Sequence, residues 1–368
     1  MSTKKDKFSK KDKIYMKIAL DLAKSRHGLT GSNPSVGCVI VKNDQIISVG
    51  ITSYNGRPHA EYNAIKNCNQ DLKDSKIYVT LEPCCHHGLT PPCTNLIIKS
   101  KISEVLYSVK DIDKRVKDKS SKILKSNKII VKKGILNKEI KNFYYPYFFN
   151  RKKKLPFVTG KIAISKNNLI YSKINKKITN SYSNKFTHFL RYKNDTLMIS
   201  YKTLNKDNPK LNCRLSGFEK FSPIRVILDN KLDSKINSNL IKTANNKNTI
   251  IFYNMAEKSK ILNFKRKGIK LIKSKINKKN RFDIKILLKK LYFLGCRNLL
   301  IEGGGELTNF LIKNKFFNKF YLYKSPNNHS KSSEYLKFKS LNVLNKKYKK
   351  KFYLNLNLRK DRIILYSY

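Results

Sequence analysis

The chain is 368 residues long, which is too many for one ordinary domain of roughly 100–200 residues and enough for two. Its hydrophobic content of 40%, which includes 21 Tyr and 19 Phe, is enough to build hydrophobic cores and excludes a disordered chain. The net charge of +56 would suit a nucleic-acid-binding protein, but 68 of the 80 basic residues are Lys spread over almost every segment, which favours a bias of the whole composition.

The first 150 residues are predicted to run α-β-β-α-β-α-β, an α/β layer arrangement. A helix is expected over Asp12–His27, where apolar residues recur at four-residue spacing before Gly28. A hairpin is expected where two β-branched runs, Val36–Val41 and Ile46–Ile51, flank a polar turn. The next predicted elements are a helix at His59–Asn67, a strand at Ile77–Leu81, a helix at Thr94–Lys99 and a strand at Glu104–Val109.

A domain boundary is predicted around Asn142–Pro156, where the pattern breaks into aromatic residues, a basic run and two prolines. The predicted domains are therefore residues 1–150 and 156–368. Strands are expected in the second domain at Phe157–Ile164, Thr196–Ser200, Arg225–Asp229, Thr249–Tyr253, Lys270–Ile272 and Asn298–Glu302, with helices at Asp283–Leu294 and from Glu306. The last forty residues are expected to form strands that complete the second domain.

Two short segments contain the residues that most strongly indicate a catalytic or metal-binding site. His59 and Glu61 lie two residues apart in PHAEYNAI, at an expected helix start, while Cys84 follows a strand and Cys93 opens the next helix. A catalytic zinc ion has three protein ligands and a fourth position open to water, and His59, Cys84 and Cys93 supply such a set. Glu61 is better placed beside the water, where it can take a proton and deliver it to a leaving amine. This order of residues is the signature of the zinc nucleobase deaminases.

A closed structural zinc site is the alternative for the same loop, with Cys84, Cys85, His86 and His87 as ligands. Adjacent cysteines seldom both reach one ion without strain. The eight residues between Cys84 and Cys93 also depart from the C-x-x-C spacing of structural sites. The pattern therefore favours the catalytic arrangement.

Three segments together resemble the deaminase half of the bifunctional riboflavin-biosynthesis deaminase/reductase family: NPSVGCVIV (Asn33–Val41), GRPHAEYNAI (Gly56–Ile65) and TLEPCCHHGLTPPC (Thr80–Cys93). The resemblance implies a three-layer fold like that of cytidine deaminase. It also implies zinc (Zn²⁺) bound by His59, Cys84 and Cys93, with Glu61 as the proton shuttle and Asn33 lining the pocket. The implied substrate is a small phosphorylated pyrimidine, 2,5-diamino-6-(5-phosphoribosylamino)pyrimidin-4-one.

The family's second domain resembles dihydrofolate reductase. The segment Ile178–Arg214 is similar to the pattern of this family domain, without gaps. NLLIEGGGELTNFLI (Asn298–Ile312) is similar to the family's strand-glycine-helix element. The resemblance implies that NADPH is contacted by Ala163, Thr203, Asp207, Gly304, Gly305, Glu306, Leu307 and Thr308. It implies that the substrate, whose ribosyl group is reduced to ribityl, is contacted by Arg191, Leu211, Arg214 and Glu302.

The glycine turn and the two arginines also have a physical rationale. Three glycines before a helix allow backbone N–H groups to approach a phosphate, where the helix N-terminus adds partial positive charge. Arginine is scarce in this chain, and the planar fork of Arg191 or Arg214 suits a ribose phosphate. Taken singly, the GGG sequence is more often a tight turn, and either arginine a surface residue.

The segment Lys161–Asn168 departs from the family pattern K-x-A-x-S-L-D-G, because KIAISKNN lacks the aspartate and the glycine. Lys177 also stands where a Trp is customary. A deaminase whose reductase domain is eroded is therefore one alternative.

A polynucleotide deaminase acting on tRNA is a second alternative, which the positive charge favours only superficially; a basic RNA-binding protein with structural zinc is a third. No signal sequence or 18-residue apolar run is seen, so a cytoplasmic enzyme without membrane segments is expected. Nucleic acid is not an expected partner, and a homo-oligomer is compatible with the sequence.

Overall fold

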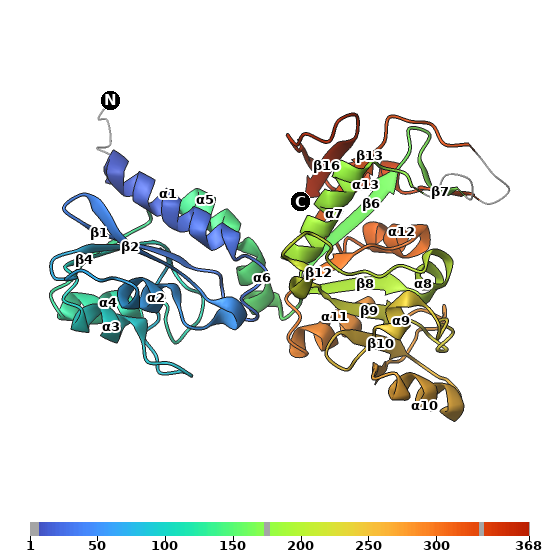
Figure 1. Cartoon of the computed structure of the whole chain (residues 1–368), viewed down its shortest axis with the longest axis horizontal. Coiled ribbons are helices and arrows are strands. Elements are labelled where there is room, and N and C mark those ends of the chain that lie inside the picture. The colour runs from blue at the N-terminus through green and yellow to red at the C-terminus, as the bar shows by residue number, and fades with distance from the viewer. Residues whose placement is uncertain (1–6, 173–176, 331–334, 368) are drawn as a thin grey trace. The chain divides into compact units, whose positions relative to one another are not determined.

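The computed structural model describes residues 7–172, 177–330 and 335–367. The chain divides into two compact units, Met1–Lys153 and Lys154–Tyr368 (Figure 1). Across the described ranges, no helix combines the length and the hydropathy that crossing a membrane requires.

The N-terminal unit is built on a sheet with the strand order β2-β1-β3-β4-β5. Its elements are α1 (Lys10–Ser25), β1 (Gly37–Lys42), β2 (Gln45–Ile51), the 3-10 turn Tyr54–Gly56, α2 (Ala60–Lys66), β3 (Lys76–Leu81), α3 (Cys93–Lys99), β4 (Glu104–Val109), α4 (Lys119–Ser126), β5 (Ile130–Lys133), α5 (Asn137–Phe143) and α6 (Tyr145–Lys153). Strand β1 pairs antiparallel with β2 and β3, whereas β4 pairs parallel with β3 and β5. Helices α1 and α5 lie on one face of the sheet and α2, α3 and α4 on the other, so the unit has three layers (Figure 1).

Close packing of α1 on the sheet depends on a glycine in β1. A Cβ atom at Gly37 would lie 1.8 Å from the carbonyl oxygen of Ala19, so no larger residue fits without moving the helix. The start of α1 is fixed by a capping box, in which Ser9 and Asp12 each accept a hydrogen bond from the other's backbone N–H. Strand β1 is covered on both faces, which explains its continuous apolar run.

The two compact units divide between Lys153 and Lys154, inside the predicted boundary segment Asn142–Pro156, and most of that segment forms α6, a helix that was not predicted. Its aromatic residues belong to the core of the N-terminal unit: Tyr144 and Phe148 are buried, and the Tyr144 hydroxyl donates to the carbonyl of Ser35 over 3.0 Å. Pro146 lies in the first turn of α6, where its missing N–H costs no helical hydrogen bond. Helices α4 and α5 and strand β5 were likewise not predicted.

The C-terminal unit contains a long mixed sheet with the strand order β11-β10-β9-β8-β12-β6-β13-β16-β15, beside the small pair β14-β7. Its strands are β6 (Phe157–Ile164), β7 (Leu169–Ser172), β8 (Thr196–Ser200), β9 (Ile224–Leu228), β10 (Thr249–Tyr253), β11 (Lys270–Lys273), β12 (Asn298–Ile301), β13 (Lys319–Lys324), β14 (Tyr335–Lys337), β15 (Lys350–Tyr353) and β16 (Arg362–Ser367). Its helices are α7 (Ser181–Lys193), α8 (Tyr201–Asp207), the 3-10 turn Glu219–Phe221, α9 (Asn239–Lys242), α10 (Lys258–Arg266), α11 (Ile284–Phe293), α12 (Gly305–Lys313) and α13 (Leu341–Lys347).

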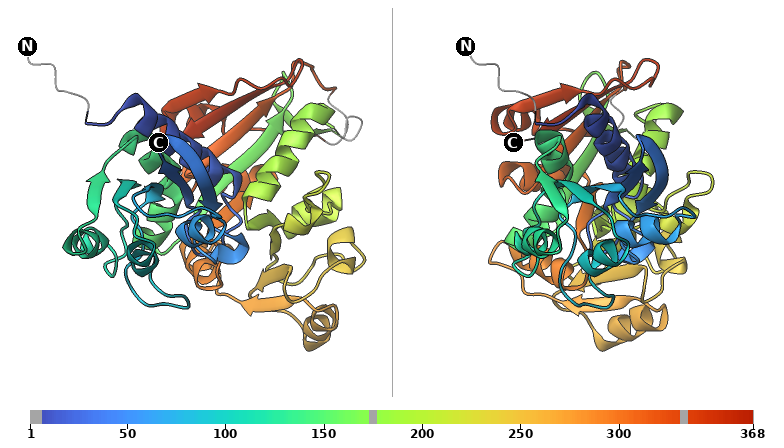
Figure 2. Two further views of the ribbon diagram at one scale, coloured as in Figure 1. Left: turned by 60° about the vertical axis from the view of Figure 1, so that its left-hand side comes forward. Right: turned by 90° about the vertical axis from the view of Figure 1, so that its left-hand side faces the viewer.

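Separate hydrophobic clusters cover the two faces of this sheet. One contains residues of α11, α12 and α13, and the other contains residues of α7, α8, α9 and α10. Helix α7 lies along β6 in Figure 1 and again in Figure 2. The α/β architecture and the expected strands of both units are confirmed, with ends that differ by one or two residues. The closing strands are present as β15 and β16, preceded by the helix α13, which was not expected.

Candidate active sites

A metal-ligand cluster lies where two helices of the N-terminal unit begin. His59 is the residue that caps α2, Cys93 is the first residue of α3, and Cys84 lies in the loop after β3. Their ligand atoms all lie within 4.8 Å of one another. His59 Nδ1 is 3.5 Å from the Sγ atom of Cys84 and 3.5 Å from that of Cys93. The folded chain thus brings the three predicted ligands together.

These distances fit a tetrahedral zinc site. Zinc–sulfur bonds of about 2.3 Å and zinc–nitrogen bonds of about 2.0–2.1 Å give a nitrogen–sulfur edge of about 3.6 Å in a tetrahedron. The Cys84 thiol accepts a hydrogen bond from the Cys93 thiol, which lowers the pKa of Cys84 to about 4. The backbone N–H of Cys93 donates to the same sulfur over 3.3 Å. The thiolate favoured by these contacts is the form of cysteine that binds metals.

Glu61 lies in the first turn of α2 and is only 4% exposed. Burial raises the pKa of its carboxyl to about 7, and the Cys84 thiolate adds to this rise. A carboxyl group with such a pKa can both accept and donate a proton near neutral pH. Its position beside His59, with which it interacts electrostatically, suits a proton-transfer group at the metal centre.

The closed structural zinc site is not supported. Among the described residues, the metal-ligand group that forms consists of His59, Cys84 and Cys93, without the neighbouring cysteine and histidines. Cys85 instead directs its thiol to the carbonyl of Arg115 over 3.4 Å. Three ligands leave a fourth coordination position for water, as catalytic zinc requires.

Asn33 lies beside the segment that leads into α2. Its side-chain Nδ2 donates to the carbonyl of Gly56 over 3.0 Å. Gly56 has φ +92°, and a Cβ there would lie 2.7 Å from the Cβ of Asn33, so the contact requires glycine. This hydrogen bond gives Asn33 a bracing role in the free protein, while its predicted contact with substrate stays a prediction.

Glu82 is a positioning group that the sequence analysis missed. The buried carboxylate accepts a hydrogen bond from the Ser120 hydroxyl over 2.6 Å and from the backbone N–H of Asp111 over 3.2 Å. These contacts hold Glu82, which precedes the loop that contains Cys84 and ends at Cys93, against α4 and against the segment after β4. No pattern in the sequence connects the three positions, which lie 29 and 38 residues apart.

Three of the four predicted substrate contacts of the reductase gather in the C-terminal unit. Arg191 on α7 forms a bidentate ion pair with Glu302, which follows β12, at 2.7 and 2.8 Å. Arg191 also donates to the carbonyl of Asn212 over 3.1 Å, and Arg214 donates to the Asn212 side chain over 2.8 Å. The fourth, Leu211, is buried in the adjoining hydrophobic cluster.

Lys161 on β6 joins this group, although the sequence analysis did not name it as a site residue. Its ammonium lies 4.8 Å from the centre of the Tyr323 ring, and burial lowers its pKa while Glu302 opposes that change. The signal available in the sequence was a lone lysine within the apolar run FVTGKIAI. A buried cation beside a carboxylate is typical of a functional site.

His188 on α7 is held neutral beside this cluster. Its Nδ1 accepts a hydrogen bond from the backbone N–H of Arg214 over 3.2 Å. Burial, together with the positive charges of Arg191 and Arg214, lowers its pKa from 6.5 to about 4. The side chain therefore stays uncharged at neutral pH.

We expect this histidine to make the C-terminal unit less stable in acid. In the unfolded chain His188 takes up a proton near pH 6.5, whereas in the fold it does so only near pH 4, so stability is lost as pH falls between these values. The loss at pH 4.5 is about 2–3 kcal/mol relative to pH 7.5. Urea unfolding of the wild type and of His188→Gln at both pH values measures it. Equal pH dependence of the two proteins would show that His188 is not responsible.

The predicted cofactor residues meet at the start of α12. Gly304 caps the helix without a side-chain hydrogen bond, and its own N–H donates to the Thr203 hydroxyl over 3.2 Å. A Cβ at Gly304 would lie 3.0 Å from that hydroxyl oxygen, and one at Gly305 would lie 2.8 Å from Ile170. The first N–H groups of a helix have no partner within the helix, and the glycines keep this backbone free of side chains, so the residues fit the phosphate of a nucleotide cofactor.

The remaining cofactor residues are placed as follows. Ala163 is on β6, and Asp207 is exposed at the end of α8. In α12, Glu306 is exposed and pairs with Lys202 over 3.0 Å, and the Thr308 hydroxyl donates to the carbonyl of Gly303 over 3.2 Å. Leu307 packs against the hydrophobic cluster of the sheet. The side chains of Thr308 and Leu307 are thus engaged within the protein, and their predicted contact with NADPH remains a prediction.

The segment that departs from the family pattern still forms a turn. Asn168 has φ +62°, a left-handed conformation that asparagine tolerates and that explains the glycine of the pattern. Asn167 accepts a hydrogen bond from the Ser165 hydroxyl over 2.6 Å and donates to the carbonyl of His329 over 2.8 Å. The two asparagines therefore preserve the turn between β6 and β7.

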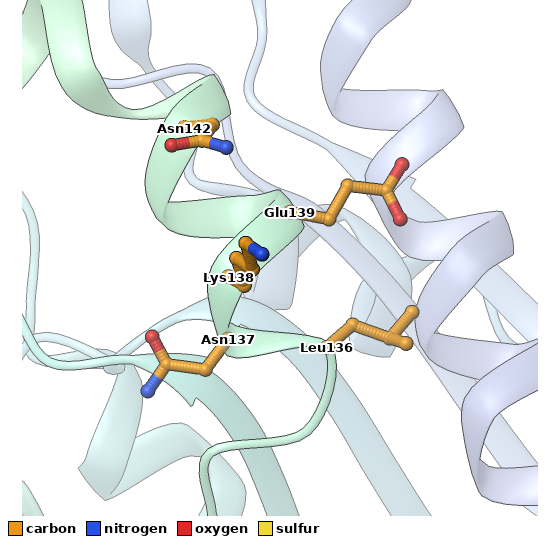
Figure 3. Close-up of a pocket in the computed structure, with 5 residues that line it drawn as sticks. All are labelled: Leu136, Asn137, Lys138, Glu139 and Asn142. Atoms are coloured by element: carbon orange, nitrogen blue, oxygen red, sulfur yellow. The ribbon is translucent and has the colours of Figure 1, made fainter.

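A shallow surface pocket lies beside α5, lined by Leu136, Asn137, Lys138, Glu139 and Asn142 (Figure 3). It contains none of the ligands or site residues above. Its one carboxylate, Glu139, forms an ion pair with Lys17 of α1. We therefore assign no function to this pocket.

Comparison with known proteins supports two catalytic parts. The family model of the cytidine and deoxycytidylate deaminase zinc-binding region matches residues 9–109, and that of the RibD C-terminal domain matches residues 170–327. The riboflavin biosynthesis protein RibD of Aquifex aeolicus is 33% identical over 317 residues, covering 86% of this chain and 87% of that protein. RibD of Actinobacillus pleuropneumoniae is also 33% identical, covering 86% of this chain and 84% of that protein.

Solved structures show the same architecture. The deaminase/reductase of Thermotoga maritima has a TM-score of 0.79 and 28% identity, covering 97% of this chain and 98% of that one. The fold is also that of Acinetobacter baumannii RibD, with a TM-score of 0.82 at 24% identity and coverage of 97% and 99%.

Fold, metal-ligand cluster and family matches together define a zinc-dependent deaminase joined to a reductase. More particularly, the chain belongs to the RibD family of riboflavin biosynthesis proteins, and it is a bifunctional enzyme of that pathway. The resemblance recognised in the sequence is thereby confirmed, including the dihydrofolate-reductase-like character of the second domain. The polynucleotide deaminase and the RNA-binding protein are not favoured.

Proposed function

We propose that residues 1–150 hydrolyse an exocyclic amine of 2,5-diamino-6-(5-phosphoribosylamino)pyrimidin-4-one and that residues 156–368 reduce the ribosyl group of the product to ribityl with NADPH. The observation that carries the first step is the cluster of His59, Cys84 and Cys93 with Glu61 beside it. The second step rests on the family match and on the open start of α12. The Thermotoga maritima relative is described as the deaminase and the reductase of these compounds.

In the deaminase, His59, Cys84 and Cys93 would hold the zinc ion. Bound there, zinc supplies Lewis acidity, which makes hydroxide available from water near neutral pH. Glu61 accepts the proton of the attacking water on a carboxylate oxygen and passes it to the departing amine. One water is consumed and ammonia leaves, so that an amine-bearing ring carbon becomes a carbonyl carbon.

In the reductase, the bound nicotinamide cofactor would supply a hydride for the anomeric carbon of the ribosyl group. Opening of the sugar ring leaves an oxygen that must acquire a proton. Lys161 is a cationic donor whose charge interacts with Glu302 and Arg191, and we assign this proton to it. Arg191, Arg214 and Glu302 orient the substrate, while Thr203 and the Gly304–Thr308 segment hold the cofactor.

A cytoplasmic setting is supported by the cysteines. All seven are free thiols, which fits a reducing compartment, where two of them remain available to a metal.

A coupled assay on one purified sample tests both activities. We expect release of ammonia from the phosphorylated pyrimidine, followed by oxidation of NADPH in equal amount. The reason is that Asn167 and Asn168, although they differ from the family pattern, preserve the turn between β6 and β7. Ammonia release without NADPH oxidation would instead establish a deaminase with an eroded reductase. No ammonia release by zinc-loaded protein would overturn the proposed function.

A further inference from the structure

The guanidinium of Arg57 connects the two segments that carry the metal ligands. Arg57 precedes His59 by two residues, and its Nη1 donates to the hydroxyl of Thr90, in the loop between Cys84 and Cys93. A Cβ atom on Gly88 in that loop would lie 3.4 Å from Arg57 Nη2. The cation therefore lies against the ligand loop, beside a position that has no side chain.

The ligand loop has no lysine or arginine of its own. PCCHHGLTPPC, residues 83–93, contains neither Lys nor Arg, although these make up 80 of the 368 residues of the chain. Leu89, at its outer end, is 89% exposed. Arg57 is a cation that folding brings to this loop, through its hydrogen bond to Thr90.

The charge of Arg57 is not neutralised by the protein. In the described ranges no carboxylate pairs with it, whereas Arg115, which follows β4, is paired with Asp113 over 2.6 Å. A guanidinium has five N–H donors, and the Thr90 hydroxyl occupies one side of that of Arg57. The half-buried side chain can therefore donate to an anion in a bidentate manner.

Gly88 keeps a side chain away from the guanidinium of Arg57. The same Cβ position that is 3.4 Å from Arg57 lies 3.9 Å from Nε2 of His86, so the glycine separates a guanidinium from an imidazole. The opposite ring nitrogen of His86 is buried and has no hydrogen-bond partner within the described chain. Polar nitrogen atoms from two segments, those of Arg57 and His86, thus lie near Gly88.

We propose that Arg57 binds the phosphate group of the nucleotide substrate in the deaminase site and makes that site selective for phosphorylated pyrimidines. This inference rests on the proposed function, which supplies a substrate with one phosphate. A charge-assisted bidentate contact contributes enough to change affinity about 10- to 100-fold. The competing explanation is that Arg57 only braces the loop through Thr90.

Two variants and two substrates separate these explanations. Arg57→Gln removes the cation, and Thr90→Val removes its hydroxyl partner but leaves the cation. The substrates are the phosphorylated pyrimidine and its dephosphorylated counterpart, with kcat/KM for ammonia release as the readout. Zinc content and circular dichroism show that each variant is folded and loaded.

We expect Arg57→Gln to lower kcat/KM for the phosphorylated substrate about 10- to 100-fold, mainly through KM, and to change the dephosphorylated one less than about 3-fold. Thr90→Val should leave the ratio of the two substrates near its wild-type value. Equal losses on both substrates in Arg57→Gln, or the same selective loss in Thr90→Val, would overturn the inference while the proposed function stands. Absence of ammonia release by the wild type from either substrate would overturn both.

Discussion

Replacing Glu61 with Gln is expected to lower kcat for ammonia release by about 10³-fold while zinc remains bound. The amide has nearly the shape of the carboxylate but cannot accept the proton of water, and general acid–base catalysis contributes about 10²–10⁴-fold to such reactions. The three metal ligands are untouched, so metal content should stay at one ion per chain. Ammonia release and zinc content measured on the same preparation provide the test.

Glu139→Gln is the matched control for this variant, because it removes an exposed carboxylate of α5 outside the site. Reduction of the deaminated product should be unchanged in both proteins, since Glu61 belongs to the other unit. If Glu61→Gln deaminates at a rate within about threefold of the wild type, the proton-transfer role assigned to Glu61 is wrong.

Replacing Glu302 with Gln should both abolish reduction and destabilise the C-terminal unit by about 3–5 kcal/mol, because it leaves Arg191 as an unpaired buried charge. Burial alone would raise the pKa of Glu302, but the Arg191 guanidinium outweighs it and lowers that pKa. The carboxylate is therefore charged in the fold at neutral pH. Urea unfolding and NADPH oxidation measure the two effects, and deamination should persist.

A double variant separates the stability effect from the catalytic effect. Arg191→Met with Glu302→Leu removes both charges, and replacing a buried pair by apolar residues is often neutral or stabilising. We expect most of the lost stability to return without any return of reduction. Recovery of reduction in the double variant would show that neither residue orients the substrate.

The metal centre could be predicted because its residues carry their chemistry in short segments. His59 and Glu61 lie close in sequence at the start of α2, and Cys84 lies nine residues before Cys93, which begins α3. Most strands of the two sheets could be predicted from their apolar, β-branched runs, whereas β5 and β13 were not predicted. Helix α11 was predicted because its apolar periodicity follows the capping residue Asp283.

Contacts made only by folding could not be predicted. Glu82 meets Ser120, Arg57 meets Thr90 and Lys161 approaches Tyr323 across 33 or more residues, and nothing local links either partner to the other. The aromatic helix α6 was not predicted for the same reason. Its sequence has no alternation, and its burial against the N-terminal sheet depends on packing that local periodicity does not encode.

Zinc K-edge absorption spectroscopy of the purified protein tests the central claim most directly, because it counts the atoms bound to the metal. The arrangement of His59, Cys84 and Cys93 predicts two sulfur atoms at about 2.3 Å and two nitrogen or oxygen atoms at about 2.0–2.1 Å, one of them exchangeable. A shell of three or more sulfur atoms, a second histidine in place of the exchangeable ligand, or active enzyme without zinc would contradict the account.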